Sequence, residues 1–142
     1  MKIVLITACG KAKENKVLPA WRLYKSTRIK HLYRRAKELN IPFYILSAKY
    51  GLVFCEDIIS PYNEIMDSKK CKKNISQIEN ILKNYDIIVF YKGGARKEYL
   101  ECIELICKKL NKNLISFGYA NMGDIKKLPE VLEIARKSFK NK

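Results

Sequence analysis

The sequence predicts an α/β fold: a three-layer domain with a mostly parallel sheet of four to five strands and helices on both faces. Four short apolar runs without polar alternation are typical of strands buried on both faces, at residues 2–7, 42–47, 86–91 and 113–116. Helical apolar periodicity follows each run, at residues 26–39, 68–84, 95–110 and 124–139. This alternation predicts right-handed crossovers in one domain over residues 1–142, with 138–142 as a frayed tail.

Composition limits the class of protein. The chain has 142 residues, of which 48% are hydrophobic, enough for one globular core. It has no run of about 18 apolar residues, so we expect neither a transmembrane helix nor a membrane partner. The apolar run at residues 3–6 is too short for a signal peptide, and we expect a cytoplasmic protein.

The cysteines argue against a disulfide framework or a zinc site, because they are odd in number and show no CxxC spacing; they are Cys9, Cys55, Cys71, Cys102 and Cys107. Cys102 and Cys107 lie among Ile and Leu, which is typical of small core residues. We therefore expect no metal and no cofactor.

The charge of the chain points to a polyanionic partner. Lys and Arg number 29 against 14 Asp and Glu, a formal net charge of +15, which favours nucleic acid or a nucleotide. A lysine-rich proteome remains an alternative. The predicted helix over 26–39 carries the candidate surface for a nucleic-acid backbone, formed by Arg28, Lys30, His31, Arg34 and Arg35.

Candidate site residues lie in the loops that follow the predicted strands. Ligands of parallel α/β sheets bind beyond the carboxyl ends of the strands. That rule selects residues 8–20, 48–67, 92–96 and 117–124.

Cys9 is the candidate nucleophile. It directly follows the first predicted strand, and Gly10, Lys11 and Lys13 come behind it. Cationic neighbours favour the thiolate, which is the nucleophilic form, and Gly10 permits close approach of a ligand. The equally weighted alternative is a small residue that fills the end of the strand. The single histidine, His31, is expected to be solvated or to contact phosphate rather than to act as a base.

The second loop offers Lys49 and Tyr50, which follow the second predicted strand. We expect Lys49 to hold a phosphate, and Tyr50 to stack on a base or donate a proton. Asp57, Tyr62 and Glu64 are expected to read a base edge or transfer protons. An ordered surface loop with a proline turn is the alternative.

The third loop offers Gly93 and Gly94, whose backbone amides open a predicted helix and suit an anion together with Arg96. The Walker A pattern is absent. The fourth loop is expected to be structural, although Tyr119 or Asn121 could face the site.

Several blocks resemble known families: ITACGKAK, then SAKYG, then a PY motif. Over about residues 6–123 they resemble a bacterial, phage and archaeal family marked by the SAKYG motif. They are similar, more distantly, to the YaaA peroxide-stress family, whose members bind DNA and limit oxidative damage. Cys9, Lys13 and the YGLV block resemble a core domain of archaeosine synthase, which modifies a deazaguanine base in tRNA. Phe54 stands where that enzyme has Pro.

These observations favour a protein that processes a nucleobase, nucleotide or nucleic acid, modifying or cleaving a base in DNA or tRNA. The expected catalytic residues are Cys9, Lys13, Lys49 and Tyr50. A covalent adduct on Cys9, such as a thioimide, is one mechanism. A non-catalytic DNA-binding protein of oxidative stress and a small nucleotide-binding module are the alternatives. The sequence leaves the substrate, the choice of DNA or RNA, and the oligomeric state open.

Overall fold

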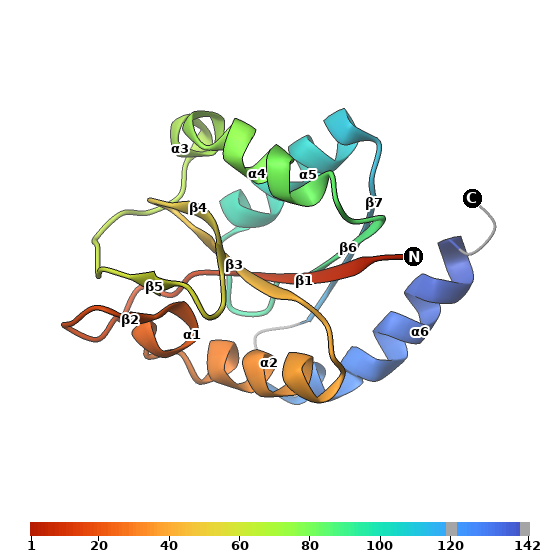
Figure 1. The fold of residues 1–142 in the computed structure, drawn as a ribbon, viewed down its shortest axis with the longest axis horizontal. Helices are drawn as coiled ribbons and strands as arrows, with labels where there is room; N and C mark the ends of the chain where they lie inside the picture. The colour runs from red at the N-terminus through yellow and green to blue at the C-terminus, as the bar shows by residue number, and fades with distance from the viewer. Residues whose placement is uncertain (119–121, 140–142) are drawn as a thin grey trace.

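The computed structural model describes residues 1–118 and 122–139 and contains a five-stranded sheet with the order β4-β3-β1-β6-β7 (Figure 1). Its strands are β1 (Ile3–Ala8), β3 (Phe43–Ser47), β4 (Gly51–Phe54), β6 (Ile87–Tyr91) and β7 (Asn113–Phe117). The central strand β1 pairs in parallel with β3 and β6, and β6 pairs in parallel with β7. Only β4 runs antiparallel in this sheet, so the predicted mostly parallel α/β sheet is confirmed.

Helices cover both faces of the sheet (Figure 1). One face carries α2 (Thr27–Glu38) and α6 (Leu128–Phe139). The other carries α3 (Ser68–Lys73), α4 (Ile75–Leu82) and α5 (Lys97–Leu110). Within the described part of the chain, no helix is both long and apolar enough to cross a membrane.

Helix α2 shows why these segments fold as they do. The Ser26 side chain caps it by accepting a hydrogen bond from the Ile29 amide, at 3.3 Å. Its buried stripe of Ile29, Leu32 and Ala36 faces the sheet, as the apolar periodicity predicts. The short helix α1 (Ala20–Leu23) precedes it, and a small ribbon of β2 (Leu18–Pro19) and β5 (Ile58–Ile59) lies beside α1.

The connections of the sheet place a crevice between β1 and β6. From β1 the chain crosses through α2 to β3, while from β6 it crosses through α5 to β7 on the opposite side. The loops that follow β1 and β6 therefore separate at the carboxyl edge of two adjacent strands, where such sheets bind ligands. Both strands are buried along their whole length, so this edge stands on a rigid core.

Three predicted boundaries are wrong. Residues 51–54, expected in a loop, form β4, because Gly51 has a φ of +79° that turns the chain into a hairpin with β3. The helix predicted over 68–84 is divided at Asn74. The segment predicted as one helix over 124–139 begins as the 3-10 helix η1 (Met122–Lys127), and α6 continues from Leu128 to Phe139. Residues 140–142 lie outside the described residues.

The prediction that the cysteines do not pair is also wrong. Cys71 of α3 and Cys102 of α5 form a disulfide, with their Cα atoms 5.8 Å apart. The two helices pack together with both cysteines on their buried faces, a proximity that residue spacing does not reveal. Cys9, Cys55 and Cys107 are free and buried, so the core role expected of Cys107 is confirmed.

A glutamine protects the open edge of β4. The Leu52 amide donates to Gln77 Oε1 at 2.9 Å, and Gln77 Nε2 donates to the Leu52 carbonyl at 2.7 Å. The side-chain amide of α4 thus replaces a neighbouring strand at this position and keeps the edge from pairing with another chain.

Replacing Gln77 with Ala is expected to lower the free energy of unfolding by about 1–2 kcal/mol, because two backbone groups lose their partners. Urea unfolding of the variant beside Ser76→Ala, an exposed neighbour on the same helix, checks this. Equal stability of the two variants would contradict the protective role of Gln77.

Candidate functional site

A cavity of about 300 Å³ lies at the crevice between β1 and β6. Its walls come from the loop after β1, the first turn of α2, the segment before α3, and the start of α5. The lining residues are Cys9, Gly10, Lys11, Lys13, Arg28, Asn63, Glu64, Ile65, Gly94, Ala95, Arg96 and Tyr99. Seven of them were predicted in the site loops, and these loops meet here: Cys9, Gly10, Lys11, Lys13, Glu64, Gly94 and Arg96.

Cys9 forms the inner wall of this cavity. Its amide donates to the Leu46 carbonyl at 3.0 Å, which extends the pairing of β1 with β3 by one residue. Its side chain is 8% exposed, and its Sγ lies 3.2 Å from the Tyr99 hydroxyl, on the first turn of α5. The thiol is thus held by the backbone of the sheet and by one phenol.

Arg28 is fixed beside Cys9 by the ends of both central strands. Its Nη1 donates to Thr7 Oγ1 at 2.6 Å and to the Ala8 carbonyl at 3.1 Å. Thr7 Oγ1 in turn donates to the Tyr91 carbonyl at the end of β6, at 2.9 Å. Burial lowers the pKa of Arg28, and the nearby Tyr91, Cys9 and Tyr99 oppose that shift. Arg28 was predicted on a helix surface that contacts a nucleic-acid backbone, whereas it lines the cavity.

A chain of hydroxyl groups lies behind the cavity. Ser47 Oγ accepts hydrogen bonds from the Lys49 and Tyr50 amides, at 3.1 and 3.0 Å, and donates to the Tyr62 hydroxyl at 2.8 Å. The Tyr62 and Tyr24 hydroxyls are 2.6 Å apart. The predicted residue Tyr62 therefore belongs to a buried network rather than to an open surface.

The phenols of this region stay protonated at neutral pH. Burial raises the pKa of Tyr62, Tyr99 and Tyr24 well above the usual value, and the proximity of Cys9 adds to each shift. Burial lowers the pKa of Lys13, while Cys9 opposes that change. The Lys13 ammonium lies 4.4 Å from the centre of the Tyr62 ring, so Lys13 joins the cavity to the hydroxyl chain.

Besides Tyr62, four residues predicted in the site loops do not line the cavity. Lys49 is exposed, and its ammonium lies over the ring of Tyr50 at 5.3 Å. The Tyr50 hydroxyl donates to the Ser60 carbonyl at 3.2 Å, and Asp57 Oδ2 accepts from the Phe54 amide at 3.2 Å. Gly93 is buried, whereas its neighbour Gly94 lines the cavity.

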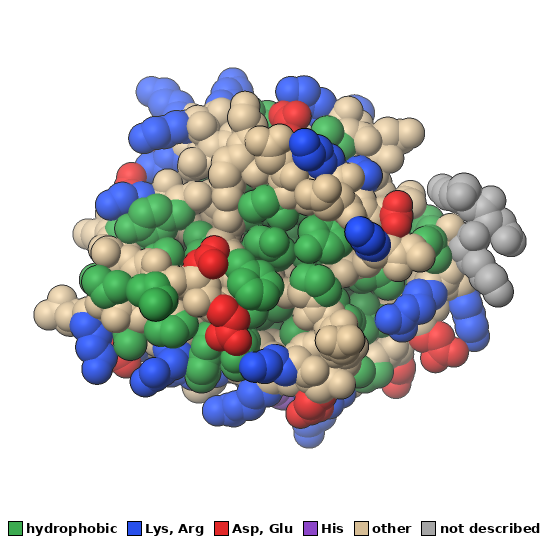
Figure 2. Space-filling model, viewed as in Figure 1, with side chains coloured by type: hydrophobic (Ala, Val, Ile, Leu, Met, Phe, Trp, Pro, Cys, Tyr) green, Lys and Arg blue, Asp and Glu red, His purple; other side chains and the backbone are tan. Residues whose placement is uncertain are grey.

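The other residues of the predicted α2 surface lie away from the cavity. Arg35 pairs with Glu38 at 2.6 Å, whereas Arg34 is exposed and Lys30 is half-buried. Burial lowers the pKa of His31, and Arg35 and Arg34 add to that shift, so this imidazole is neutral at pH 7. Figure 2 shows Lys and Arg around the periphery of one face, with hydrophobic side chains gathered across its middle.

The fourth predicted loop contributes no described residue to the cavity. Gly118 has a φ of +103° and lies so close to the Tyr91 ring that a Cβ would overlap it. Gly118 therefore lets the chain after β7 pack directly against the Tyr91 ring of β6, which fits a structural role. Tyr119 and Asn121 lie outside the described residues.

Two lining residues, Tyr99 and Asn63, were not predicted from the sequence as part of the site. Tyr99 was assigned to the apolar stripe of its helix, yet its hydroxyl reaches Cys9 from the first turn. The sequence could have indicated Tyr99 as a site residue, because it lies one helical turn beyond a predicted site loop. Asn63 belongs to an irregular segment whose path the sequence does not specify, whereas its neighbour Glu64 was expected at the site and lines the cavity.

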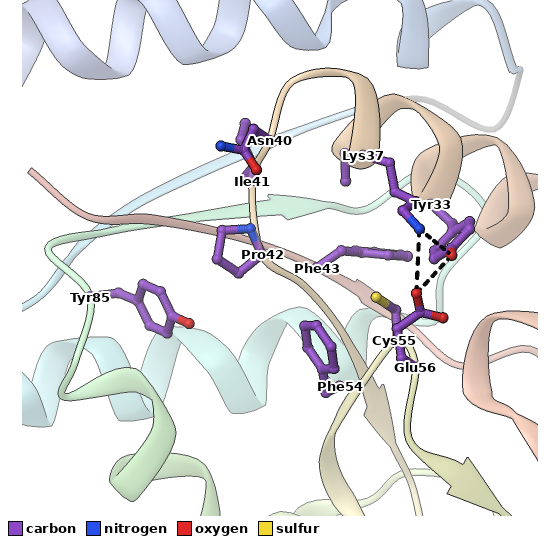
Figure 3. Close-up of a pocket in the computed structure, with 11 residues that line it drawn as sticks. Tyr33, Lys37, Asn40, Ile41, Pro42, Phe43, Phe54, Cys55, Glu56 and Tyr85 are labelled. Carbon is purple, nitrogen blue, oxygen red and sulfur yellow. Dashed lines mark hydrogen bonds and ion pairs between the residues drawn. The ribbon is translucent and has the colours of Figure 1, made fainter.

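A second cavity of about 450 Å³ lies at the amino end of β3, at the opposite edge of the sheet (Figure 3). Three of its polar side chains are bonded to one another, because Lys37 Nζ donates to the Tyr33 hydroxyl at 3.2 Å and Tyr33 donates to Glu56 Oε2 at 2.9 Å. Its walls are aromatic or carry a thiol, namely Phe43, Phe54, Tyr85 and Cys55. Burial raises the pKa of Cys55 to about 11, so this thiol is neutral and unsuited to attack.

Among the described residues, no three His, Cys, Asp or Glu side chains gather to hold a metal ion. The reactive groups in and around the first cavity are therefore one thiol, several phenols and an excess of cationic side chains.

The fold and the first cavity define an α/β protein with a cationic site at the carboxyl edge of a mostly parallel sheet. The chain belongs to a family of unknown function (DUF6884), whose model matches residues 3–116. A search of the curated proteins and one of the solved structures found no match. The resemblances to the YaaA family and to archaeosine synthase therefore stay predictions.

Proposed function

We propose that this protein is an enzyme that acts on a nucleobase, a nucleotide or a nucleic acid, with Cys9 as its nucleophile. The position of Cys9 carries the proposal, because its thiol lies at the inner wall of a cavity lined by four cationic side chains and hydrogen-bonded to Tyr99. A nucleophile needs such a pocket to meet an electrophilic carbon, and cations attract an anionic substrate to it.

The reaction that fits these groups is addition of the thiol to an unsaturated carbon of a base. The S–H bond breaks, an S–C bond forms, and the proton moves to the substrate atom that receives the displaced electron pair. Addition to a nitrile would give a thioimide and addition to a ring carbon a saturated adduct. Tyr99 and Lys13 are placed to donate hydrogen bonds or a proton as charge develops.

Covalent capture tests the proposal. The protein is incubated with small molecules, tRNA and DNA extracted from its own cells, and mass spectrometry then follows substrate loss and adducts on the Cys9 peptide. Cys9→Ser is expected to lose the adduct and to reduce turnover by about a thousandfold or more. Cys55→Ser, whose thiol lines the other cavity, serves as the matched control and is expected to keep both. Full turnover by Cys9→Ser would overturn the assignment of the nucleophile.

The net charge of +15 favours a second function, nucleic-acid binding without catalysis. Such a function predicts an affinity for nucleic acid that falls steeply with salt concentration and depends on the exposed face of α2. Loss of binding in an Arg34→Glu, Arg35→Glu double variant, with Cys9→Ser unaffected and no substrate consumed, would favour it over the enzyme.

A further inference from the structure

We infer that the cavity binds a phosphate group and that the Arg28 guanidinium holds it beside Cys9. The inference rests on the proposed function, because it names the class of substrate that Cys9 would meet: a phosphorylated molecule of mononucleotide size.

The partners of Arg28 leave its charge uncompensated. Nη1 donates to a hydroxyl and a carbonyl, from Thr7 and Ala8, and both acceptors are neutral. Within residues 1–118 and 122–139, no carboxylate lies within ion-pairing distance of Arg28. A largely buried charge without a counter-charge is costly, and a bound anion removes that cost.

The remaining charges around the cavity point the same way. Lys11, Lys13 and Arg96 add three positive charges, and Glu64 is the one carboxylate among the described lining residues. Arg96 is partly offset by Glu98, at 3.5 Å, whereas Lys13 Nζ donates to the neutral Lys11 carbonyl at 3.1 Å. This excess suits a phosphate monoester, which carries close to two negative charges at neutral pH, better than a carboxylate, which carries one.

The shape of the cavity fits the same ligand. Gly94 has a φ of +73°, and a Cβ there would lie 3.8 Å from Arg28 Nε, so the chain passes close to the guanidinium. Nη1 is anchored to the strand ends, and a planar guanidinium so fixed presents its other N–H groups in a fork that matches phosphate oxygens. A volume of about 300 Å³ accommodates a phosphate and one ring system, with Cys9 on the same wall.

Calorimetric titration at constant ionic strength tests the inference, with inorganic phosphate, AMP and adenosine as probes. AMP is expected to bind more tightly than adenosine. Arg28→Gln is expected to weaken AMP and phosphate binding by about tenfold to a hundredfold. Arg34→Gln, which removes an exposed Arg from the same helix, is expected to bind as the wild type does. A titration with a 5′-phosphorylated single-stranded oligonucleotide then identifies the source of the phosphate. Tighter binding of the oligonucleotide than of AMP would indicate a nucleic acid, and tighter binding of AMP a free nucleotide.

Absence of phosphate and AMP binding, equal binding of AMP and adenosine, or equal affinity of Arg28→Gln and Arg34→Gln would overturn the inference. If Arg28→Gln does not fold, Lys11→Gln replaces it with Lys16→Gln as control, because both lysines are exposed and only Lys11 lines the cavity. Cys9→Ser is expected to keep phosphate binding. Turnover by Cys9→Ser would thus refute the role of Cys9 as nucleophile and leave the phosphate site standing. Failure of the wild type to bind phosphate would refute the phosphate site and leave the role of Cys9 standing.

Discussion

Between pH 9 and pH 11 the folded protein is expected to lose about 4 kcal/mol of stability because of two buried thiols. Burial raises the pKa of Cys55 and of Cys107 from 9.0 to about 11. In the unfolded chain both thiols ionise near pH 9, whereas in the folded chain they stay protonated. The unfolded state therefore binds fewer protons across this interval, and stability falls as the pH rises.

Urea unfolding at several pH values from 8 to 11 measures this loss. Cys55→Ala removes one of the two thiols, so about half of the thiol contribution, roughly 2 kcal/mol, is expected to disappear from the decline even if the substitution lowers stability at pH 8. Buried tyrosines add to the decline from about pH 10, because the phenols of the unfolded chain ionise there while burial raises the pKa of Tyr44 in the folded chain to about 12. A decline of the same slope in Cys55→Ala would show that this thiol is not the titrating group.

Reduction of the Cys71–Cys102 disulfide is expected to lower the free energy of unfolding by about 4 kcal/mol. The bond joins residues separated by 31 positions, and cross-linking a loop of that length restricts the unfolded chain. For a chain of 142 residues, such a change corresponds to a melting temperature lower by roughly 10 °C. Thermal melts with and without a phosphine reductant measure it directly.

A Cys71→Ala, Cys102→Ala double variant provides the control for reduction. Its melting temperature is expected to lie near that of the reduced wild type and to be insensitive to the reductant. If reduction leaves the wild type unchanged while all thiols titrate as free, the disulfide contributes nothing to stability.

The sequence predicted the central part of the fold well, because β1, β3 and β6 are continuous apolar runs whose pattern allows one interpretation. The prediction failed where the structure depends on contacts between residues that are distant in the sequence. Gly51–Phe54 is too short to show a period, and its partner strand is visible only in the structure. The pairing of Cys71 with Cys102 depends on two helices that meet in space.

The candidate site was predicted in part for the same reason. The rule of carboxyl strand ends selects Cys9, Lys13, Gly94 and Arg96, which the structure brings to one cavity. It does not distinguish the two ends of a loop, so Lys49 and Asp57 were selected although they lie outside the cavity. Arg28 was assigned to a solvated helix face, because helical periodicity does not show that the first turn of α2 reaches the end of β1.

The packing of α1 on α2 also places the fluorescent tryptophan side chain at a defined contact. The chain contains a single tryptophan, Trp21, whose ring is stacked on Tyr33 with centroids 4.2 Å apart and planes at 1°. Because Tyr33 lines the aromatic cavity at the amino end of β3, indole emission senses that region. Fluorescence of the unlabelled protein therefore monitors one defined contact during unfolding, and its response to a ligand separates occupancy of this cavity from occupancy of the one around Cys9.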